Sequence, residues 1–492
     1  MTAHLPALQV AIPLVCAPLC VLLRSRTAAW LLFLVAALGS LTCAVVLAER
    51  VARGGTVRYA MGGWPSPSGI EFVVSGFNTP ILLLVSLIAA VTAVYSRRSI
   101  TAEIDPGSTA PLYACLCLTL SGLLGLAITG DAFNAFVFLE ISSLATYTMI
   151  ALGRRRQALL ASFRYLVVGT VGAVFLLLGI GFAYAVTGTL NMSDLSQRLI
   201  ESPGDRALYA AVVFVFVGLA VKMALFPLHS WLPAAYAEAP SAVSTFIAAT
   251  GTKVAIYLFC RFAFTVFGAA LVFRVMPIEE IGLLLAALAM LVGSAVACFQ
   301  NDFRYVLAWS SVAQIGYIIA GISLATAAGV SAGYLHMINH AVTKAALFAA
   351  AGLLLMQIGS VRLSALAGLG RSMPWTFAAI VVAGLGLVGV PPTAGFVSKW
   401  ALVTALVEKG TWPVLVAMLA SSLLAVVYIG RVVEIAWFRE PPADVAPTRP
   451  PASMAAATWL LVLISVYFGI DATLPAGLAD GAASALLGLG GG

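Results

Sequence analysis

Apolar stretches of about twenty residues follow one another along almost the whole chain, and each ends at a glycine, a proline or a short charged cluster. An α-helix of that length crosses the hydrocarbon core of a bilayer. Because 62% of the 492 residues are apolar and only 9% are charged, the chain could not bury its apolar surface in water. The repetition therefore predicts an all-α polytopic membrane protein.

Hydropathy over a window of about twenty residues predicts fourteen transmembrane helices. The predicted spans are 5–23, 30–48, 70–95, 110–129, 132–151, 161–187, 208–227, 241–262, 277–299, 303–322, 330–357, 374–405, 412–436 and 453–472. The first lacks a basic start and is followed by Arg24 and Arg26, so we interpret it as a membrane span and not as a secretory signal peptide. The segment GGWPSPSG within Glu49–Gly69 predicts turns and a small hairpin.

The distribution of basic residues predicts the side of the membrane on which the termini lie. An even number of spans puts both termini on one side. If that side is the outside, thirteen of the 26 arginines and lysines lie in inner loops and eight in outer loops. Cytoplasmic loops carry the excess of these residues, so we expect both termini on the outer side. The five basic residues left within spans are Arg164, Lys222, Lys253, Lys344 and Lys399.

Two of these lysines lie in Gly218–Phe262, where a proline-rich turn joins two apolar stretches. Lys222 lies five residues before Pro227, and Lys253 lies about a dozen residues into the second stretch. An ionisable group at such a depth costs several kcal/mol unless it faces a partner or water, so both are candidates for an ion or proton path. The alternative is a lysine that snorkels to the surface, which suits Lys222 better because it is closer to a boundary.

Two predicted spans contain prolines that break a helix near a lysine. Pro227 follows Lys222, and Pro391 and Pro392 precede Lys399. A proline removes backbone hydrogen bonds, and the carbonyls that it frees at membrane depth need water or protein partners. Broken helices in matching positions are also typical of transporters built from inverted repeats. We therefore interpret the two spans as equivalents.

A second correspondence supports an internal repeat. Asp131 precedes Glu140 by nine residues, and Asp302 precedes Ser311 by nine residues. The repeated unit has five helices, so an odd number of crossings inverts the second copy; a bundle without a repeat could show the same coincidences. The repeat divides the chain into 1–109 with the first three helices, 110–262 as the first unit, 277–436 as the inverted second unit, and 437–492 as a cytoplasmic linker and a fourteenth helix.

Glu140 is the acidic residue at the middle of a predicted span, with no other charge within eight residues on either side. A lone carboxylate in hydrocarbon would take up a proton, whereas a carboxylate beside Lys222 would stay ionised. An acid and a base in one dry site can exchange proton affinity as they move apart or together, which makes the pair a candidate switch. The alternative is a structural salt bridge between helices.

His336, His340 and Lys344 recur every four residues, so they lie on one helix face and could pass protons through water. A metal site is not expected, because no glutamate lies between the histidines as in HExxH and no nearby Asp, Glu or Cys completes a ligand set. Two hydrogen-bonded core histidines are the alternative. The seven cysteines form no CxxC pair and lie in apolar stretches, so we interpret them as buried small residues.

Seven titratable residues therefore stand out as candidate site residues. They are Glu140, Lys222, Lys253, His336, His340, Lys344 and Lys399. A channel for a bare cation prefers carboxylates or carbonyls, whereas a path rich in lysine suits protons. The pattern predicts a proton path spread over both halves of the chain.

Five motifs in the chain resemble one known family. They are TGDAFNAFVFLEISSLATY, VKMALFPLHSWLPAAYAEAPSAVSTFIAATGTKVAIY, LAWSSVAQIGYI, HMINHAVTKAALF and PPTAGFVSKW. They are similar to the antiporter-like membrane subunits shared by respiratory complex I, membrane-bound hydrogenases and Mrp-type multisubunit cation/proton antiporters. The resemblance covers about residues 70–440, and the pattern GDxFNxFVFxE around Glu140 is most similar to the D-type member of the Mrp antiporters.

The resemblance implies a fourteen-helix core with two inverted five-helix repeats, and a role for each candidate residue. Glu140 and Lys222 would be the coupling pair, Lys253 the central relay, His336, His340 and Lys344 the onward connection, and Lys399 the group that exchanges protons with the far side or a neighbouring subunit. Ser75 stands where the family often has an aspartate, which could alter an outer proton exit. Arg164 and Arg304 stand where lysines are common and keep the charge.

From the resemblance we expect a proton-translocating subunit of a multisubunit monovalent cation (Na⁺)/H⁺ antiporter in a bacterial cytoplasmic (inner) membrane. Its partners would be other membrane subunits, protons, Na⁺ and the lipid bilayer, with no nucleic acid. The chain itself would hold no cofactor or metal and would catalyse no redox reaction. The alternative is a proton-pumping antiporter-like subunit of a membrane-bound hydrogenase or complex I-like oxidoreductase. A scaffold whose charges merely hold helices together is a further alternative.

Overall fold

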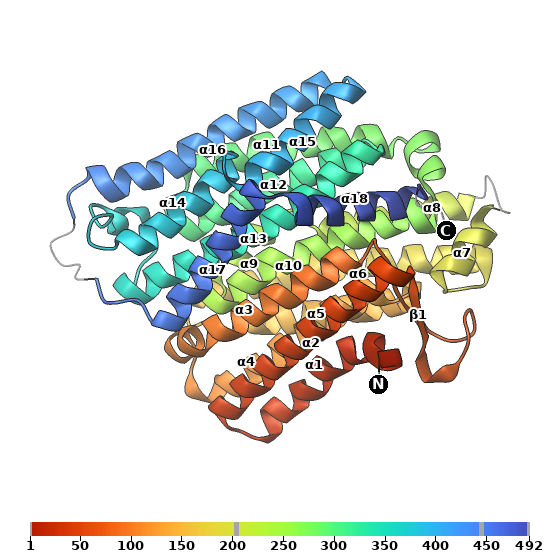
Figure 1. The fold of residues 1–492 in the computed structure, drawn as a ribbon, viewed down its shortest axis with the longest axis horizontal. Helices are drawn as coiled ribbons and strands as arrows, with labels where there is room; N and C mark the ends of the chain where they lie inside the picture. Colours follow the sequence, from red (N-terminus) through yellow and green to blue (C-terminus); the bar gives the residue numbers. More distant parts are fainter. Residues whose placement is uncertain (1, 201–205, 442–446, 490–492) are drawn as a thin grey trace.

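The computed structural model describes residues 2–200, 206–441 and 447–489, and in these ranges the protein is almost entirely helical (Figure 1). The helices are α1 (Leu5–Leu22), α2 (Arg26–Gly54), α3 (Thr79–Glu103), α4 (Thr109–Ile128), α5 (Ala132–Ala151), α6 (Arg156–Thr187), α7 (Met192–Ile200), α8 (Arg206–Lys222), α9 (Leu232–Glu238), α10 (Ser241–Cys260), α11 (Ile278–Phe299), α12 (Phe303–Ser323), α13 (Ala327–Ile358), α14 (Pro374–Val388), α15 (Ala394–Lys409), α16 (Trp412–Phe438), α17 (Ala452–Ile470) and α18 (Thr473–Leu487). Strands β1 (Val57–Ala60) and β2 (Glu71–Val74) pair antiparallel and form the expected hairpin.

The fourteen predicted spans are confirmed. In the described part of the chain, twelve helices are long and apolar enough to cross a membrane, and each corresponds to one predicted span. The other two predicted spans, 208–227 and 374–405, are interrupted helices. The first interruption separates α8 from α9 and the second separates α14 from α15, at the two proline sites. The chain therefore has the fold of a multi-pass membrane protein with two broken helices.

The elements α4, α5, α6, α8–α9 and α10 recur in the same order as α11, α12, α13, α14–α15 and α16. Helices α6 and α13 are each 32 residues long, and each ends at a glycine in the left-handed conformation, Gly188 and Gly359. The carboxylates of Asp131 and Asp302 accept backbone N–H bonds at the starts of α5 and α12. Aspartate is favoured there because it satisfies a free donor of the first turn. The two five-helix units are thus built from matching elements, while their boundaries at 110–262 and 277–436 stay a prediction.

The two units run in opposite directions. Asp131 forms an isolated bridge with Asn191 at the end of the molecule that carries the hairpin, where neighbouring Thr129 pairs with β2. Asp302 forms the matching bridge with Arg362 beside the end of α16. Figure 1 shows the hairpin and the end of α16 at opposite ends of the bundle. The second unit is therefore inverted relative to the first.

Both ends of the described chain lie at the hairpin end of the bundle (Figure 1). His4 Nδ1 is hydrogen-bonded to the hydroxyl of Tyr59 in β1 at 3.0 Å. Gly481 and Ser484 of α18 line one cavity together with Arg58 of β1. The prediction that the termini share a side is consistent with this arrangement.

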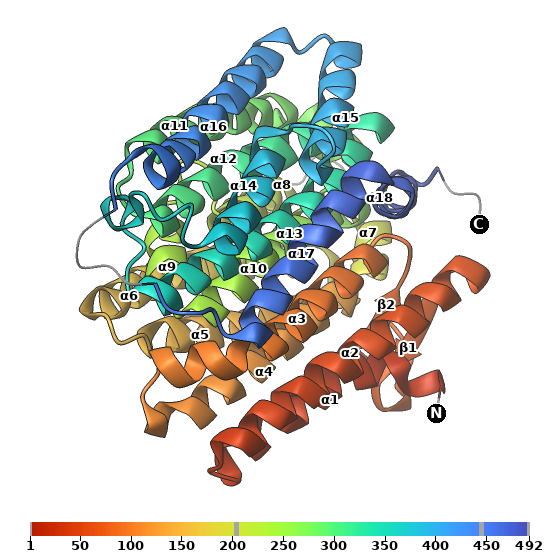
Figure 2. The ribbon, with the colours of Figure 1, turned by 60° about the vertical axis from the view of Figure 1, so that its left-hand side comes forward.

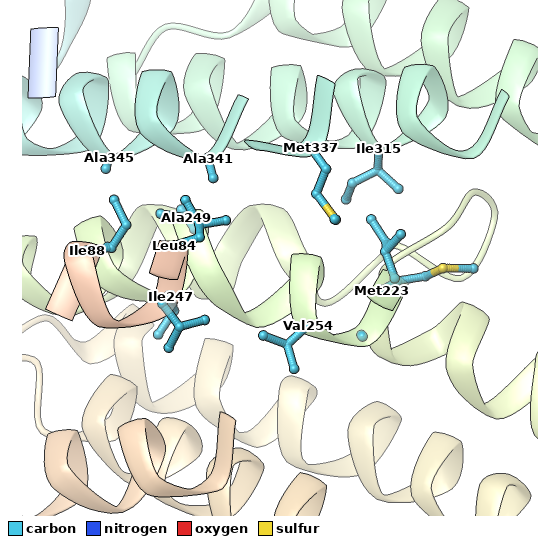
Figure 3. Packing of buried hydrophobic residues seen from close by; sticks show 14 of the residues in the cluster. Leu84, Ile88, Met223, Ile247, Ala249, Val254, Ile315, Met337, Ala341 and Ala345 are labelled. Atoms are coloured by element: carbon cyan, nitrogen blue, oxygen red, sulfur yellow. The ribbon is translucent and has the colours of Figure 1, made fainter. Parts of the chain in front are cut away.

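The middle of the bundle is formed by α10, α12 and α13. Figure 2 shows α1 and α2 on one flank and α15 and α16 on the opposite flank, with α10 and α13 between them. Figure 3 shows Ala341 and Ala345 of α13 facing Ala249 of α10 and Ile88 of α3, so that small side chains allow these helices to approach closely. Almost every residue of α10 and α12 is buried. A lysine or histidine on these helices is therefore held away from lipid.

Three features of the fold differ from the sequence-based expectation. The third span was expected from residue 70, but β2 occupies Glu71–Val74 and α3 begins at Thr79, because these residues pair with β1 instead of extending the helix. Helix α7 was not expected, since it has nine residues and includes Asp194 and Arg198, too few apolar residues for a hydropathy window. Helix α18 extends the chain beyond the fourteenth span and packs along α13, where Asp480 accepts a hydrogen bond from Ser331.

Candidate functional site

The seven candidate residues lie on α5, α8, α10, α13 and α15, and their side chains are turned into the bundle. Six of them are less than 10% exposed, and the side chain of Glu140 is 20% exposed. Arg164, the fifth basic residue found within a predicted span, instead lies exposed on the outside of α6. The four lysines within spans are thus separated from this arginine by burial, as a functional path in the interior requires.

Glu140 and Lys222 form a direct ion pair between α5 and α8. The Nζ of Lys222 donates to Glu140 Oε1 at 2.9 Å and to Ser143 Oγ at 3.0 Å. The lysine side chain is only 4% exposed, so water cannot replace the carboxylate as its main partner. Lys222 is also the last residue of α8, where a positive charge is favoured by the helix dipole. The prediction that these two residues meet is confirmed; the snorkelling alternative for Lys222 is excluded.

The break after α8 keeps its backbone groups satisfied through the protein. Trp231 Nε1 donates to the carbonyl of Val221 at 2.9 Å, and the N–H of Leu225 donates to Ala220 at 2.9 Å. Carbonyls near the end of a helix at membrane depth require such partners. The indole therefore fixes the end of α8, and with it the position of Lys222.

A cavity of about 40 Å³ separates the ion pair from α10. Lys222, Ser142 and Ser143 line one side, and Thr250 and Thr252 of α10 line the other. This volume accommodates about three water molecules, given roughly 10–15 Å³ for each, and hydroxyl groups provide their hydrogen-bond partners. The cavity therefore offers a wet connection from Lys222 to α10.

Lys253 lies on the far side of this cavity and is completely buried. Its Nζ donates to the carbonyl of Ala248 at 2.5 Å and to Thr252 Oγ1 at 3.4 Å. Within residues 2–200, 206–441 and 447–489, no carboxylate forms an ion pair with Lys253. Thr252 is thus both a wall of the cavity and a partner of Lys253, and it joins the two lysine sites.

His336 and His340 stack on one face of α13, as their spacing predicts. Their ring centroids are 6.0 Å apart and the ring planes differ by 5°. His336 bonds at both nitrogens, through Nδ1 to Ser398 Oγ at 2.9 Å and through Nε2 to Gln314 Oε1 at 2.8 Å. Because an amide oxygen can only accept, the Nε2 of His336 carries the proton. His336 is therefore held in one orientation by two helices.

His340 differs from His336 in its hydrogen bonding. In the described part of the chain neither of its ring nitrogens has a hydrogen-bond partner, although the residue is only 3% exposed. A buried polar group without a partner costs about 1–3 kcal/mol, so water is expected beside this ring. One turn further along α13, Lys344 donates to the carbonyl of Leu307 at 2.7 Å and to Ser310 Oγ. The hypothesis of two satisfied core histidines therefore fails for His340.

Lys399 closes the second helix break. Its Nζ donates to the carbonyls of Leu387 at 2.7 Å and Val388 at 3.1 Å, which are the last residues of α14. It also bonds Ser422 Oγ at 3.0 Å and lies 4.7 Å from the centre of the Tyr317 ring. A cation at the carbonyl end of a helix is favoured by the dipole. Lys399 and Lys222 both adjoin a break, but carbonyls take the place of the carboxylate at Lys399.

The structure thus brings the candidates together in two ways. Glu140 and Lys222 are in direct contact, and His336 reaches the residue next to Lys399 through Ser398. Lys253 and Lys344 connect to the others only through hydroxyl groups, carbonyls and cavity space. Such a row of titratable groups can relay protons through intervening water, and it offers no carboxylate cage to a bare cation.

Sequence reasoning missed an ion cluster at the start of α10. Glu103 of α3 accepts hydrogen bonds from the backbone and hydroxyl of Ser241, each at 2.9 Å, and lies 3.8 Å from Arg304. Glu238 accepts from the hydroxyl of Tyr305 at 3.1 Å. The signal available was Glu238 in AEAP directly after the broken helix, but Glu103 is distant in sequence and lies near a span boundary. The cluster anchors the end of α10 at the side opposite the hairpin.

His229 was also missed. It lies in the break between α8 and α9, where its ring is 5.2 Å from Phe226 and 5.3 Å from Trp309 between centroids. In the described residues its Nδ1 has no hydrogen-bond partner. A histidine two positions after Pro227, in a segment expected to be hydrated, was the available signal.

Comparison with known proteins gives a family that accounts for this arrangement. The family described as NADH:quinone oxidoreductase/Mrp antiporter, TM, matches residues 129–425, which include all seven candidate residues. The match begins just before α5 and ends within α16, so it spans most of both five-helix units.

Individual relatives come from both kinds of assembly named by the resemblance. The N-type member of the NADH-quinone oxidoreductase of Desulforudis audaxviator is 41% identical over 466 residues, covering 94% of this chain and 92% of that protein. The D-type member of the Na⁺/H⁺ antiporter of Alkalihalophilus pseudofirmus is 31% identical over 407 residues, covering 82% and 81%. A chain in the structure of the Mrp complex from Dietzia sp. DQ12-45-1b superposes with a TM-score of 0.91 at 26% identity, covering 99% and 97%. The chain therefore belongs to the NADH:quinone oxidoreductase/Mrp antiporter transmembrane family, as one of its antiporter-like membrane subunits.

Proposed function

We propose that this chain translocates protons as a membrane subunit of a multisubunit Na⁺/H⁺ antiporter in a bacterial cytoplasmic membrane. The observation that carries the proposal is the buried Glu140–Lys222 pair, which adjoins a hydroxyl-lined cavity leading to Lys253. Relatives that are subunits of multisubunit membrane complexes support a working unit made with other membrane subunits.

The ion pair acts as the gate of the path. At 2.9 Å and an effective dielectric constant of about 20, the attraction between the two charges is on the order of 6 kcal/mol. While the pair is closed, this attraction holds the proton on Lys222. When α5 and α8 move apart, the lysine loses that stabilisation and its proton passes to water in the cavity and on to Thr252 and Lys253. Transport is then coupled to whatever separates the pair.

Beyond Lys253, the path continues along α13 to α15. His340 has two free nitrogens in the described structure and Lys344 lies one turn away, so both can bind a proton delivered by water. His336 and Ser398 link this face to Lys399. We assign to Lys399 the exchange with the far side of the membrane or with a neighbouring subunit.

The hairpin end of the bundle faces outward in this proposal. The greater number of arginines and lysines at the opposite end supports that orientation. Trp64, in the exposed loop of the hairpin, provides a site for the test. Labelling of a Trp64→Cys variant in intact cells by a membrane-impermeant thiol reagent is expected; labelling only in inverted vesicles would reverse the orientation.

The function is tested by Na⁺-dependent proton flux in inverted vesicles. Glu140→Ala and Lys222→Ala are expected to abolish coupled flux while the complex still assembles. Glu279 and Lys409 form a matched pair, also at 2.9 Å, nearer the surface between α11 and α15, and their alanine variants serve as controls that retain flux. Coupled flux at the wild-type level in either Glu140→Ala or Lys222→Ala would refute the proposal.

A second candidate is a proton-pumping subunit of a membrane-bound hydrogenase or complex I-like oxidoreductase. The 41% identity to the N-type member of an NADH-quinone oxidoreductase favours it. The same proton path would then be driven by electron transfer on partner subunits. Purification through a tag on this chain distinguishes the two: small membrane proteins without cofactors support the antiporter, and partners that bear iron–sulfur clusters or nickel support the oxidoreductase.

A further inference from the structure

Three arginines converge on one cavity at the end of the bundle opposite the hairpin. The cavity measures about 620 Å³ and lies between α2, the last turns of α3 and the start of α17. Arg97 and Arg98 come from α3, and Arg449 comes from the segment that leads into α17. Thr101 and Ser453 add hydroxyl groups to the lining. The volume lies in the range of about 300–1,000 Å³ that is typical of ligand sites.

The arginines are held in place by specific contacts. The guanidinium of Arg97 lies 4.6 Å from the centre of the Trp30 ring, and Trp30 Nε1 donates to the carbonyl of Ala93 at 2.9 Å. A cation over an indole face is stabilised by the ring quadrupole. One position of the site is therefore fixed between α2 and α3.

Arg449 is positioned by its neighbour Thr448. The backbone N–H of Thr448 donates to the carbonyl of Gln357 at 3.0 Å, and Gln357 Nε2 donates to the carbonyl of Thr448 at 3.1 Å. The hydroxyl of Thr376 in turn donates to Gln357 Oε1 at 2.7 Å. The segment before α17 is thus tied to α13 and α14, so that Arg449 is presented to the cavity by a fixed backbone.

The cavity carries three positive charges without compensation from the surrounding protein. None of its lining residues is acidic. In the ranges that the structure describes, Arg97, Arg98 and Arg449 form no ion pair, although other arginines at this end do, such as Arg154 with Asp105 at 3.1 Å. Like charges that share one cavity repel one another, so an anion placed among them is strongly favoured.

We propose that this cavity binds the phosphodiester headgroup of an anionic phospholipid. Arginine matches phosphate through paired N–H donors, and basic pockets between transmembrane helices bind lipid headgroups of this kind. Val94 and Met356 line the same cavity and give its wall an apolar part, against which acyl chains can lie. Trp30 belongs to the class of side chain that is enriched at the level of the headgroups. Free phosphate shares the headgroup chemistry but has no use for the apolar wall.

The test is native mass spectrometry of the purified complex, titrated with phosphatidylglycerol and, separately, with phosphatidylcholine. The site variant carries Arg97→Gln, Arg98→Gln and Arg449→Gln. The control variant carries Arg24→Gln, Arg26→Gln and Arg371→Gln, which removes the same charge from exposed positions outside the cavity. We expect the site variant to lose at least tenfold in phosphatidylglycerol affinity and the control variant to stay within twofold of wild type.

Three results would overturn the proposal: unchanged phosphatidylglycerol affinity in the site variant, an equal loss in both variants, and displacement of the lipid by millimolar inorganic phosphate. The first shows that the arginines do not bind the lipid, the second a general effect of charge, and the third a site for free phosphate. If the triple variant does not assemble, Arg449→Gln alone is used, because Arg449 lies in an extended segment outside the helices. A threefold loss is expected for it, and no loss would overturn the proposal equally.

Discussion

Replacing Glu140 by glutamine keeps the shape of the side chain but removes the negative charge that lies 2.9 Å from Lys222 Nζ. The lysine side chain is 4% exposed, so its charge would be left in the interior without a counterion. Removing one partner of a buried pair costs about 3–5 kcal/mol. The Glu279–Lys409 pair has the same length, but its lysine is 36% exposed, and a pair of that kind contributes about 0.2–1 kcal/mol. Glu279→Gln is therefore the matched control.

The double variant Glu140→Gln with Lys222→Met separates stability from mechanism. Replacing both members of a buried pair by neutral groups of similar size is often neutral or stabilising. We therefore expect thermal unfolding of the purified complex to fall clearly in Glu140→Gln, to recover in the double variant and to change little in Glu279→Gln. Proton flux should stay absent in the double variant although its stability recovers.

Flux at the wild-type level in the stable double variant would refute this reasoning. The charges of Glu140 and Lys222 would then only hold α5 against α8, as a scaffold requires. A double variant as unstable as the single one would show instead that the stability argument from burial is wrong.

Two further predictions concern the cavity and the second helix break. Thr252→Val keeps the volume but removes the hydroxyl that lines the cavity and bonds Lys253, so proton flux is expected to fall at least tenfold with little change in unfolding temperature; unchanged flux contradicts the assigned route. Gly469→Ala places a methyl group against the carbonyl of Pro392 in the α14–α15 break, so the unfolding temperature should fall, whereas Gly477→Ala, with open space around it, should be neutral or stabilising by about 0.5–1 kcal/mol. Equal effects of the two alanines would contradict the packing of α17 against the break.

Much of the site follows from the sequence because a charge in hydrocarbon restricts what can surround it. Glu140 and Lys222 were expected to meet since each needed a partner in a dry site, and the structure has them in contact. The spacing of His336, His340 and Lys344 fixed a common helix face without any tertiary information. Hydropathy gave the fourteen spans for the same reason, because a helix must satisfy its own backbone in lipid.

The remaining features depend on tertiary contacts that periodicity does not encode. Lys399 was expected to match Lys222, but it binds the carbonyl end of α14, which depends on how the broken helix folds back. The contact of Glu103 with Arg304 joins residues 201 positions apart, and no local pattern marks it. Helix α18 was not expected because its glycine and alanine content is weakly hydrophobic; its position is set by packing along α13.

The most direct test of the central claim is proton flux through the complex carrying Lys253→Met. Lys253 is fully buried, and in the described structure it is not part of an ion pair, so methionine fills its space without leaving a charge unpaired. The Glu140–Lys222 pair and the assembly should stay intact. If the interior row of titratable groups carries the protons, Na⁺-dependent proton flux in vesicles is lost while the intact complex can still be purified. Wild-type flux from an assembled Lys253→Met complex would contradict the account.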